Sequence, residues 1–255
     1  MSEVQTREDD GVVEVRLNRP GKKNALTGAM YGAMADALAQ AGASVSARVV
    51  LFSAEGDTFT AGNDIGDFLA MAGEFAETPP ARFIRALVTF EKPMVAAVQG
   101  LAVGVGTTML LHCDLVYAAP QARFSTPFVD MGLVPEAGSS ALLPSRIGYQ
   151  RAAALLLLGE AMGAEQALAA GLVNAVVAAD VLQEHARERA RAIAAKPPNA
   201  LATARRLMRG DRASLEAHMR REQEAFGGAV RSAEARAAFT AFLERRPPKT
   251  ARTTA

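Results

Sequence analysis

Short apolar runs separated by polar or glycine-rich loops mark the first half of the chain. Residues 11–17 alternate apolar and polar side chains, which is the two-residue period of a strand, and apolar runs at 48–53, 94–98 and 114–118 predict buried strands. Residues 27–41 repeat apolar side chains with helical spacing, behind a threonine that can cap the helix. The alternation predicts parallel βαβ units, with ligand-binding groups at the carboxyl ends of the strands.

Beyond residue 148 the pattern becomes helical. Composition and spacing predict helices at 150–158, 164–170, 181–195, 199–209 and 213–245. No segment of the sequence is repeated or of low complexity. A helical C-terminal part with many apolar faces favours contacts between subunits.

The composition narrows the classes of function. At 255 residues the chain can bury a core as one domain, and a net charge of +1 without a basic block argues against nucleic-acid binding. The longest apolar stretches are too short to span a bilayer, and residues 1–10 are too acidic and polar for a secretory signal. A single cysteine, Cys113, excludes an internal disulfide framework, and three scattered histidines lack the spacing of a metal site. We therefore expect a cytoplasmic protein that binds no metal, membrane or nucleic acid.

Two loops contain the candidate chemistry. The first, residues 59–65, has small residues around Gly62 that let a ligand approach the backbone closely, but it also fits an ordinary turn in which Asp64 caps the next helix. The second, residues 99–107, follows a buried strand and leads into a predicted helix that runs to about residue 112. Free N–H groups at that helix start therefore point toward whatever docks there.

A phosphate and an oxyanion are the two candidate ligands of the second loop. Met109 occupies the place of the third glycine in a dinucleotide-binding fingerprint, and the lysine of a P-loop is absent. Two N–H donors from two such loops can converge on one carbonyl oxygen, so an oxyanion fits better.

An ordered set of motifs along nearly the whole chain resembles the enoyl-CoA hydratase/isomerase (crotonase) superfamily. The motifs are Asn18-Arg19-Pro20, Asn24-Ala25-Leu26, Phe59-Thr60-Ala61-Gly62-Asn63-Asp64, Lys92-Pro93, Gln99-Gly100, Gly104-Val105-Gly106, Cys113-Asp114, Phe124-Ser125-Thr126-Pro127-Phe128, Gly132-Leu133-Val134-Pro135-Glu136, Gly171-Leu172-Val173 and Phe242-Leu243-Glu244-Arg245-Arg246-Pro247. The resemblance implies an α/β fold: a crotonase-like spiral of ββα turns over residues 1–195, which binds CoA and contains the catalytic site, and a helical C-terminal trimerisation region over 196–255. It also implies an acyl-CoA substrate, with CoA as part of that substrate and no permanently bound cofactor, and a homotrimer or hexamer.

The resemblance also assigns residues to a site. It places an oxyanion hole at the backbone N–H groups of Ala61 and Val105, where removing one donor costs about 3–4 kcal/mol of transition-state stabilisation. Val105 departs from the glycine that is commonest at its position, so its side chain must point away from the thioester. The residues implied to bind CoA are Lys23, Asn24, Ala25, Leu26, Gly62, Asn63 and Asp64.

The reaction depends on which carboxylates are present. Hydration of an enoyl thioester needs two carboxylates that hold one water, and Thr108 and Phe128 occupy the two positions where the hydratases of this family have glutamates. Glu136 instead resembles the single catalytic base of the peroxisomal-type Δ3,Δ2-enoyl-CoA isomerases. An apolar pocket that includes Phe128, together with Met131 and Leu133, is expected to raise the pKa of this glutamate.

Three hypotheses follow. The first is an isomerase in which Glu136 moves a proton from C2 to C4 of a 3-enoyl-CoA. The second is an enoyl-CoA hydratase that uses Asp130 or Glu136, and we rank Asp130 as the lower candidate acid. The third is a non-catalytic subunit that binds CoA thioesters. An alternative without a catalytic role is also open: Glu136 fits a solvated turn residue before a helix capped by Ser139 or Ser140.

Several polar residues are not expected to belong to a site. His112, Cys113 and Asp114 are consecutive and cannot converge as a catalytic triad, so Cys113 is expected to be a small buried hydrophobe. His185 and His218 lie in charged helices and are expected to face solvent. The same expectation holds for the arginines of the helices predicted at 181–195 and 199–209, although one or two of them also suit CoA phosphates; they are Arg187, Arg189, Arg191, Arg205, Arg206 and Arg209.

Overall fold

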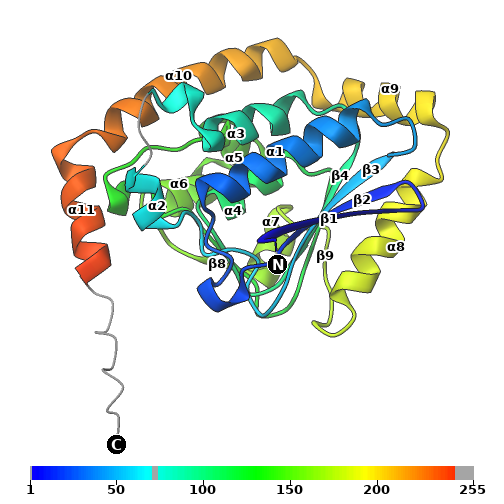
Figure 1. Cartoon of the computed structure of the whole chain (residues 1–255), viewed down its shortest axis with the longest axis horizontal. Coiled ribbons are helices and arrows are strands. Elements are labelled where there is room, and N and C mark those ends of the chain that lie inside the picture. The colour runs from blue at the N-terminus through cyan, green and yellow to red at the C-terminus, as the bar shows by residue number, and fades with distance from the viewer. Residues whose placement is uncertain (1, 71–73, 245–255) are drawn as a thin grey trace, which may run out of the picture.

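A computed structural model describes residues 2–70 and 74–244 as a mixed α/β protein (Figure 1). Its main sheet has six strands in the order β1-β2-β3-β4-β6-β9, with β1 antiparallel to β2 and the other neighbours parallel. These strands are β1 (Val4–Asp9), β2 (Val12–Leu17), β3 (Val49–Ala54), β4 (Met94–Val98), β6 (Leu115–Ala118) and β9 (Ala175–Val176). The four strands predicted from the sequence are therefore confirmed as neighbours in one sheet.

Strand β1 was not predicted, and its position explains why. It lies at the edge of the sheet, and all of its side chains except Val4 are exposed. An exposed edge strand needs no apolar alternation, so its sequence reads as polar. A two-residue turn of Asp10 (φ +49°) and Gly11 (φ +74°) joins it to β2, as in type I′ hairpins.

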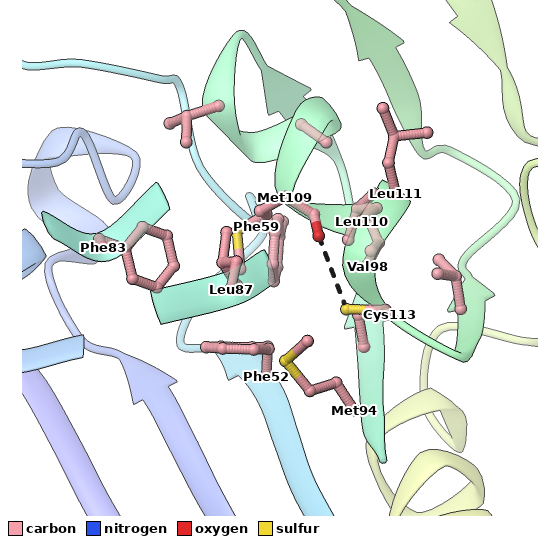
Figure 2. Packing of buried hydrophobic residues seen from close by; sticks show 14 of the residues in the cluster. Phe52, Phe59, Phe83, Leu87, Met94, Val98, Met109, Leu110, Leu111 and Cys113 are labelled. Carbon is pink, nitrogen blue, oxygen red and sulfur yellow. Dashed lines mark hydrogen bonds between the residues drawn. The ribbon is translucent and has the colours of Figure 1, made fainter. Parts of the chain in front are cut away.

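The central strands are buried on both faces. On one face, α1 (Gly28–Ala43) and α3 (Pro79–Thr89) cover the sheet, and Phe52 of β3 meets Phe83 of α3 edge-on with ring centroids 6.3 Å apart (Figure 2). On the other face, the side chains of β3 and β4 pack against α8 (Leu182–Ala194). Burial on both faces is the reason that the parallel strands read as continuous apolar runs.

A smaller second sheet and several short helices lie after β4. The sheet contains β5 (Leu101–Val103), β7 (Arg123–Ser125) and β8 (Met162–Gly163) in that order. The helix predicted from residue 104 to about 112 divides into a short α-helix, α4 (Val105–Thr108), and a 3₁₀ helix, η3 (Met109–His112). The remaining elements of the core are η1 (Pro20–Lys22), α2 (Ile65–Ala70), η2 (Phe75–Glu77), η4 (Val129–Met131), α5 (Ser139–Ile147), α6 (Tyr149–Leu156) and α7 (Ala164–Ala170).

The helices at the C-terminal end pack back onto the rest of the chain. They are α9 (Pro198–Arg209), α10 (Arg212–Val230) and α11 (Ala233–Glu244), so the helix predicted over 213–245 is interrupted after residue 230, and its last residue lies outside the described residues. Phe226 of α10 and Phe239 of α11 belong to the same hydrophobic cluster as the face of the sheet under α1. The division between residues 195 and 196 and the subunit contacts of the second part stay predictions.

Of the eight histidines and arginines expected to face solvent, six are not fully exposed: Arg205 is buried, and the half-buried ones are His185, Arg187, Arg191, Arg209 and His218. Arg205 is buried with 7% exposure, because its Nε lies 2.8 Å from Asp114 Oδ2 and its Nη1 donates to the Phe90 carbonyl at 2.9 Å. His185 is half-buried against the ring of Tyr117, and His218 is half-buried on α10. Each prediction failed because helical spacing shows which side chains share a face, and does not show which partner covers that face.

No helix within residues 2–70 and 74–244 is long and apolar enough to cross a membrane.

Gly100, between β4 and β5, provides a test of this fold. Its φ is +57°, and a Cβ there would lie 2.0 Å from the carbonyl oxygen of Asp57, so Gly100→Ala should lower the free energy of unfolding by on the order of 3 kcal/mol. Gly228→Ala is the matched control, because Gly228 is an exposed helical glycine with open space around it and gains helix propensity. Urea denaturation of both variants measures the difference, and equal stability would contradict the described loop.

Candidate functional site

A cavity of about 110 Å³ lies where the two predicted loops meet. Its lining includes Ala61, Val105 and Glu136, and Phe68 of α2 and Phe239 of α11 add apolar wall from distant parts of the chain. The structure therefore brings together the three residues that the sequence assigned to proton transfer and oxyanion binding.

Glu136 is buried at the wall of this cavity, with 6% exposure. Among the described residues it is the only carboxylate in the cavity lining, and Thr108 Oγ1 donates a hydrogen bond to its Oε1. Burial raises the pKa of Glu136 to about 7, against the hydrogen bond from Thr108, which lowers it, while the nearby charge of Glu222 raises it further. The alternative in which Glu136 is a solvated turn residue is therefore wrong.

The backbone after Glu136 has a left-handed turn. Ala137 has φ +57° and Gly138 has φ +75°, a conformation that costs an alanine about 1–2 kcal/mol and a glycine far less. His112 Nε2 lies 2.8 Å from the Ala137 carbonyl and donates to it when the proton is on that nitrogen. Gly138 is the N-cap of α5, so neither Ser139 nor Ser140 caps this helix.

The two predicted oxyanion donors differ in their present partners. Val105 is the first residue of α4, so its N–H has no acceptor within the helix, and its side chain is buried in the main hydrophobic cluster. The Ala61 N–H donates to the Lys23 carbonyl at 2.9 Å. The Val105 N–H thus has no acceptor within its helix, whereas the Ala61 N–H already has one, and an oxyanion hole at these two groups stays a prediction.

The two segments predicted to bind CoA lie side by side. Leu26 pairs with Asn63 in a parallel bridge, in which the Leu26 N–H donates to Gly62 and the Asp64 N–H donates to Leu26. Leu26 is fully buried, Ala25 is half-buried and Lys23 is exposed.

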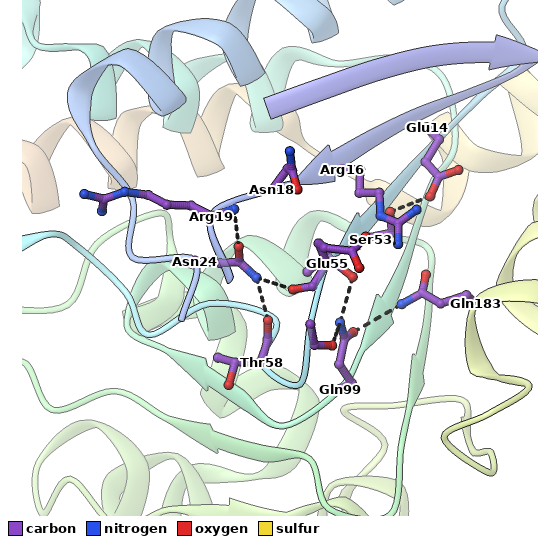
Figure 3. Close-up of polar contacts among 12 residues, drawn as sticks. Glu14, Arg16, Asn18, Arg19, Asn24, Ser53, Glu55, Thr58, Gln99 and Gln183 are labelled. Carbon is purple, nitrogen blue, oxygen red and sulfur yellow. Dashed lines mark hydrogen bonds and ion pairs between the residues drawn. The ribbon is translucent and has the colours of Figure 1, made fainter. Parts of the chain in front are cut away.

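Asn24 has a structural role within that pair of segments. It is fully buried, and its side chain accepts from the Arg19 N–H at 2.7 Å and donates to the carbonyls of Glu55 and Thr58 at 2.9 and 2.7 Å (Figure 3). Every polar atom of this side chain is therefore engaged within the protein. Lys23 and Asn24 both have positive φ, so these bonds hold a turn that few residues adopt.

The polar residues of the first loop also have partners. Asn63 Oδ1 accepts a hydrogen bond from the buried Tyr31 hydroxyl, and both residues line the cavity. Asp64 pairs with Arg19 at 2.9 Å and caps α2 through the Asp67 N–H. Burial acts to raise the pKa of Asp64, but the hydrogen bonds from Arg19 and the backbone overcome it and lower this pKa. The first loop therefore both caps α2, through Asp64, and forms part of the cavity wall, through Asn63.

Asp130, the lower-ranked acid, lies outside the cavity. It is exposed on η4 and is absent from the lining, whereas Phe128, Met131 and Leu133 are part of it. The predicted apolar side chains therefore line the same cavity as Glu136, and Asp130 does not line it.

A second cavity, of about 160 Å³, lies between α3 and α10 on another side of Glu136. Both cavities include Phe75, Ile84 and Glu136 in their lining. The walls of the second cavity are mainly apolar, with Val88 from α3 and Met219 from α10.

The three consecutive residues His112, Cys113 and Asp114 point to different partners, as expected. The Cys113 thiol is buried and donates to the Met109 carbonyl, and burial raises its pKa to about 12 (Figure 2). Asp114 accepts from the Met94 N–H at 2.8 Å and from Arg205. No cluster of His, Cys, Asp and Glu that could bind a metal occurs among the residues the structure describes.

Sequence reasoning missed three residues that act on Glu136 or its turn. In the sequence, Thr108 stands out only because it occupies a position where the hydratases have a glutamate. Nothing in the sequence indicates that its hydroxyl donates a hydrogen bond to Glu136. His112 and Glu222 contact the turn from residues far along the chain, and only the tertiary structure reveals them.

Comparisons with known proteins agree with this geometry. Residues 7–252 match the protein family described as Enoyl-CoA hydratase/isomerase. The chain is 33% identical over 247 residues to enoyl-CoA delta isomerase 2 of Rattus norvegicus, which covers 94% of this chain and 63% of the rat protein. It is also 32% identical over 251 residues to 2,3-dehydroadipyl-CoA hydratase of Escherichia coli, covering 97% of this chain and 98% of that protein.

Solved structures give the same result for the fold. An enoyl-CoA hydratase/isomerase from Pseudoalteromonas atlantica superposes with a TM-score of 0.91 at 42% identity, covering 98% of this chain and all of that one. The Pseudomonas aeruginosa protein OdaA superposes with a TM-score of 0.92 at 44% identity, covering 96% of this chain and all of that one. The crotonase fold with its helical C-terminal region is therefore confirmed, and the chain belongs to the enoyl-CoA hydratase/isomerase family.

Proposed function

We propose that this protein is an enoyl-CoA isomerase that shifts the double bond of a 3-enoyl-CoA to the 2-position. The observation that supports it most is the single buried carboxylate, Glu136, in an apolar cavity between the two oxyanion loops. A double-bond shift needs one group that removes and returns a proton, whereas hydration needs two groups that hold a water.

The proposed reaction has two steps. The Glu136 carboxylate removes a proton from C2, the C2–H electron pair moves into the C1–C2 bond, and the thioester oxygen becomes an enolate. Glu136 then returns the proton to C4, where the C3–C4 electron pair forms the new C4–H bond. The C1–C2 pair moves to C2–C3, and the enolate oxygen restores the thioester carbonyl. A pKa of about 7 suits both steps, because the group is ionised often enough to accept a proton and acidic enough to return it.

The backbone is proposed to stabilise the enolate oxygen. The Val105 N–H at the start of α4 is one donor, and the Ala61 N–H is the other. The thioester oxygen would replace the Lys23 carbonyl, which Ala61 contacts at 2.9 Å. This exchange requires the Lys23–Asn24 turn to shift when substrate binds.

The adjacent segments 23–26 and 61–64 support the proposal that CoA binds along them, as part of the substrate. The backbone and the exposed Lys23 are the available groups there, because Asn24 and Leu26 are buried. The proposed assembly is a homotrimer or hexamer, and exposed apolar side chains on α9, Leu207 and Met208, are suited to a subunit contact. The cytoplasmic location stays a prediction from cysteine content.

An enoyl-CoA hydratase is the second candidate. It is supported by the full-length likeness to the Escherichia coli 2,3-dehydroadipyl-CoA hydratase. The cavity weighs against it, because Thr108 and Phe128 stand at the two hydratase glutamate positions and Asp130 is exposed outside the cavity. A non-catalytic subunit that binds CoA thioesters is a third candidate, and turnover of either substrate excludes it.

Replacing the proposed base tests the assignment. Glu136→Gln should reduce conversion of 3-hexenoyl-CoA to 2-hexenoyl-CoA by about 10²–10⁴-fold, because an amide cannot accept the C2 proton. Asp130→Asn is the control, and it should retain wild-type activity because Asp130 is exposed outside the cavity. Chromatography of the CoA esters measures the isomerisation product, 2-hexenoyl-CoA, and the product of its hydration. Hydration of 2-hexenoyl-CoA that survives in Glu136→Gln would reject the isomerase assignment.

The pH profile should report the titration of Glu136. Because burial raises its pKa to about 7 and the base must be ionised, kcat/KM should rise with pH through a midpoint near 7 and then level off. Thr108→Val removes a hydrogen bond that lowers this pKa, so the midpoint should move to higher pH. A wild-type midpoint near that of an ordinary glutamate, or a midpoint that Thr108→Val moves downward, would contradict the described environment.

A further inference from the structure

Helix α5 begins in the turn that follows Glu136, and it has no capping side chain of its own. Its N-cap is Gly138, whose φ is +75°, and no side chain of the turn accepts the first N–H groups of the helix. A buried helix start needs acceptors for those groups. The Ser139 N–H donates to the Glu136 carbonyl at 3.0 Å, and the acceptors for the N–H groups on either side of it come from α10, far along the chain.

Glu222 of α10 supplies these acceptors. Its Oε2 accepts from the Gly138 N–H at 2.6 Å, and its Oε1 accepts from the Ser140 N–H at 3.0 Å and from the Ser140 hydroxyl. The side chain has only 8% exposure. One carboxylate therefore fixes the backbone two and four residues after Glu136.

Glu222 has no place in either cavity. It is absent from the lining of both, although its neighbours Met219 and Gln223 line the second one. It therefore acts on a bound substrate only through the turn or through its charge. The other contacts at Glu136 and Ala137, from Thr108 and His112, come from neutral groups: burial lowers the pKa of His112 to about 4.

We propose that Glu222 is a positioning residue for the proposed isomerase reaction, which holds the turn of Glu136 in place and keeps a negative charge behind it. This inference rests on the proposed function for its kinetic consequence. Its geometric part, the control of the Glu136 environment, does not depend on which reaction the protein catalyses.

The titratable and charged groups around Glu136 come from four elements. Arg85 of α3 lines the second cavity together with Glu136, as do Glu216 and Arg220 of α10. Tyr31 of α1 stays a neutral phenol, because burial and then the charge of Glu136 raise its pKa. His112 of η3 is neutral near pH 7, and α10 provides Glu222. His218, also on α10, lies 3.5 Å from Glu222 and offsets its charge when protonated. Of these groups, Glu222 is the one whose charge acts to raise the pKa of Glu136.

Two substitutions separate the effect of the charge of Glu222 from the effect of its side-chain length. Glu222→Gln keeps the length and one acceptor but removes the charge, so the midpoint of the Glu136 titration should fall by about half a unit to one unit. Glu222→Asp keeps the charge but shortens the side chain, so the midpoint should stay near the wild-type value. In both variants kcat should fall about tenfold with little change in KM, because the base is misplaced while the binding loops are intact. Glu224→Gln, an exposed glutamate on the same helix, is the matched control and should change neither quantity.

The titration is measured on the full-length protein by carbon-13 NMR of labelled glutamate carboxyls, with the Glu136 signal assigned by its loss in Glu136→Gln. Because this readout needs no turnover, it tests Glu222 even if the isomerase proposal fails. A lower midpoint in Glu222→Gln together with an unchanged one in Glu222→Asp is the expected result. If both variants lose thermal stability but leave the midpoint and kcat at wild-type values, Glu222 is only a structural cap and the proposal is overturned. Should Glu222→Gln not fold, a wild-type kcat in Glu222→Asp overturns it equally.

Discussion

The burial of one carboxyl group, Glu136, is the constraint on which the rest of the site depends. A carboxylate without water is costly unless hydrogen bonds compensate it, and Glu136 receives one side-chain hydrogen bond, from Thr108. This limited compensation leaves its pKa near 7, where a group exchanges protons readily. Thr108 stands where the hydratases of this family have a glutamate. The position that would supply a second acid in a hydratase therefore supplies a neutral hydrogen-bond donor to the proposed base.

The fold brings this carboxylate to the two loops through its layers. Parallel strands buried on both faces place the segments after β2, β3 and β4 side by side. Leu26, after β2, pairs with Asn63, after β3, and Thr60, after β3, pairs with Ala102, after β4. Helices α10 and α11 then cover the cavity and contribute Phe226 and Phe239. These helices help to bury Glu136, and its burial raises the pKa of the carboxyl group.

Much of this architecture could be predicted from the sequence, and the failures have physical reasons. Apolar patterns in the sequence predict the buried strands β2, β3, β4 and β6, whereas the edge strand β1 is polar because its side chains are exposed to solvent. Ordered motifs pointed to Glu136, but its burial and its bond to Thr108 depend on packing between residues 28 positions apart. Arg205 was expected in solvent because helical spacing does not reveal Asp114. The hydrogen bond from the Ala61 N–H to the Lys23 carbonyl was not foreseen because the turn at Lys23 has no sequence signal.

Transfer of one proton from C2 to C4 by a single buried carboxylate is tested most directly with a labelled substrate. A 3-enoyl-CoA with deuterium at C2 would be converted in ordinary water, and the position of the label in the product would be read by mass spectrometry and NMR. Transfer by the buried Glu136 predicts that part of the deuterium reappears at C4, because its exchange with solvent is slower than its return. Complete loss of the label to water, or a hydrated product, would contradict the account.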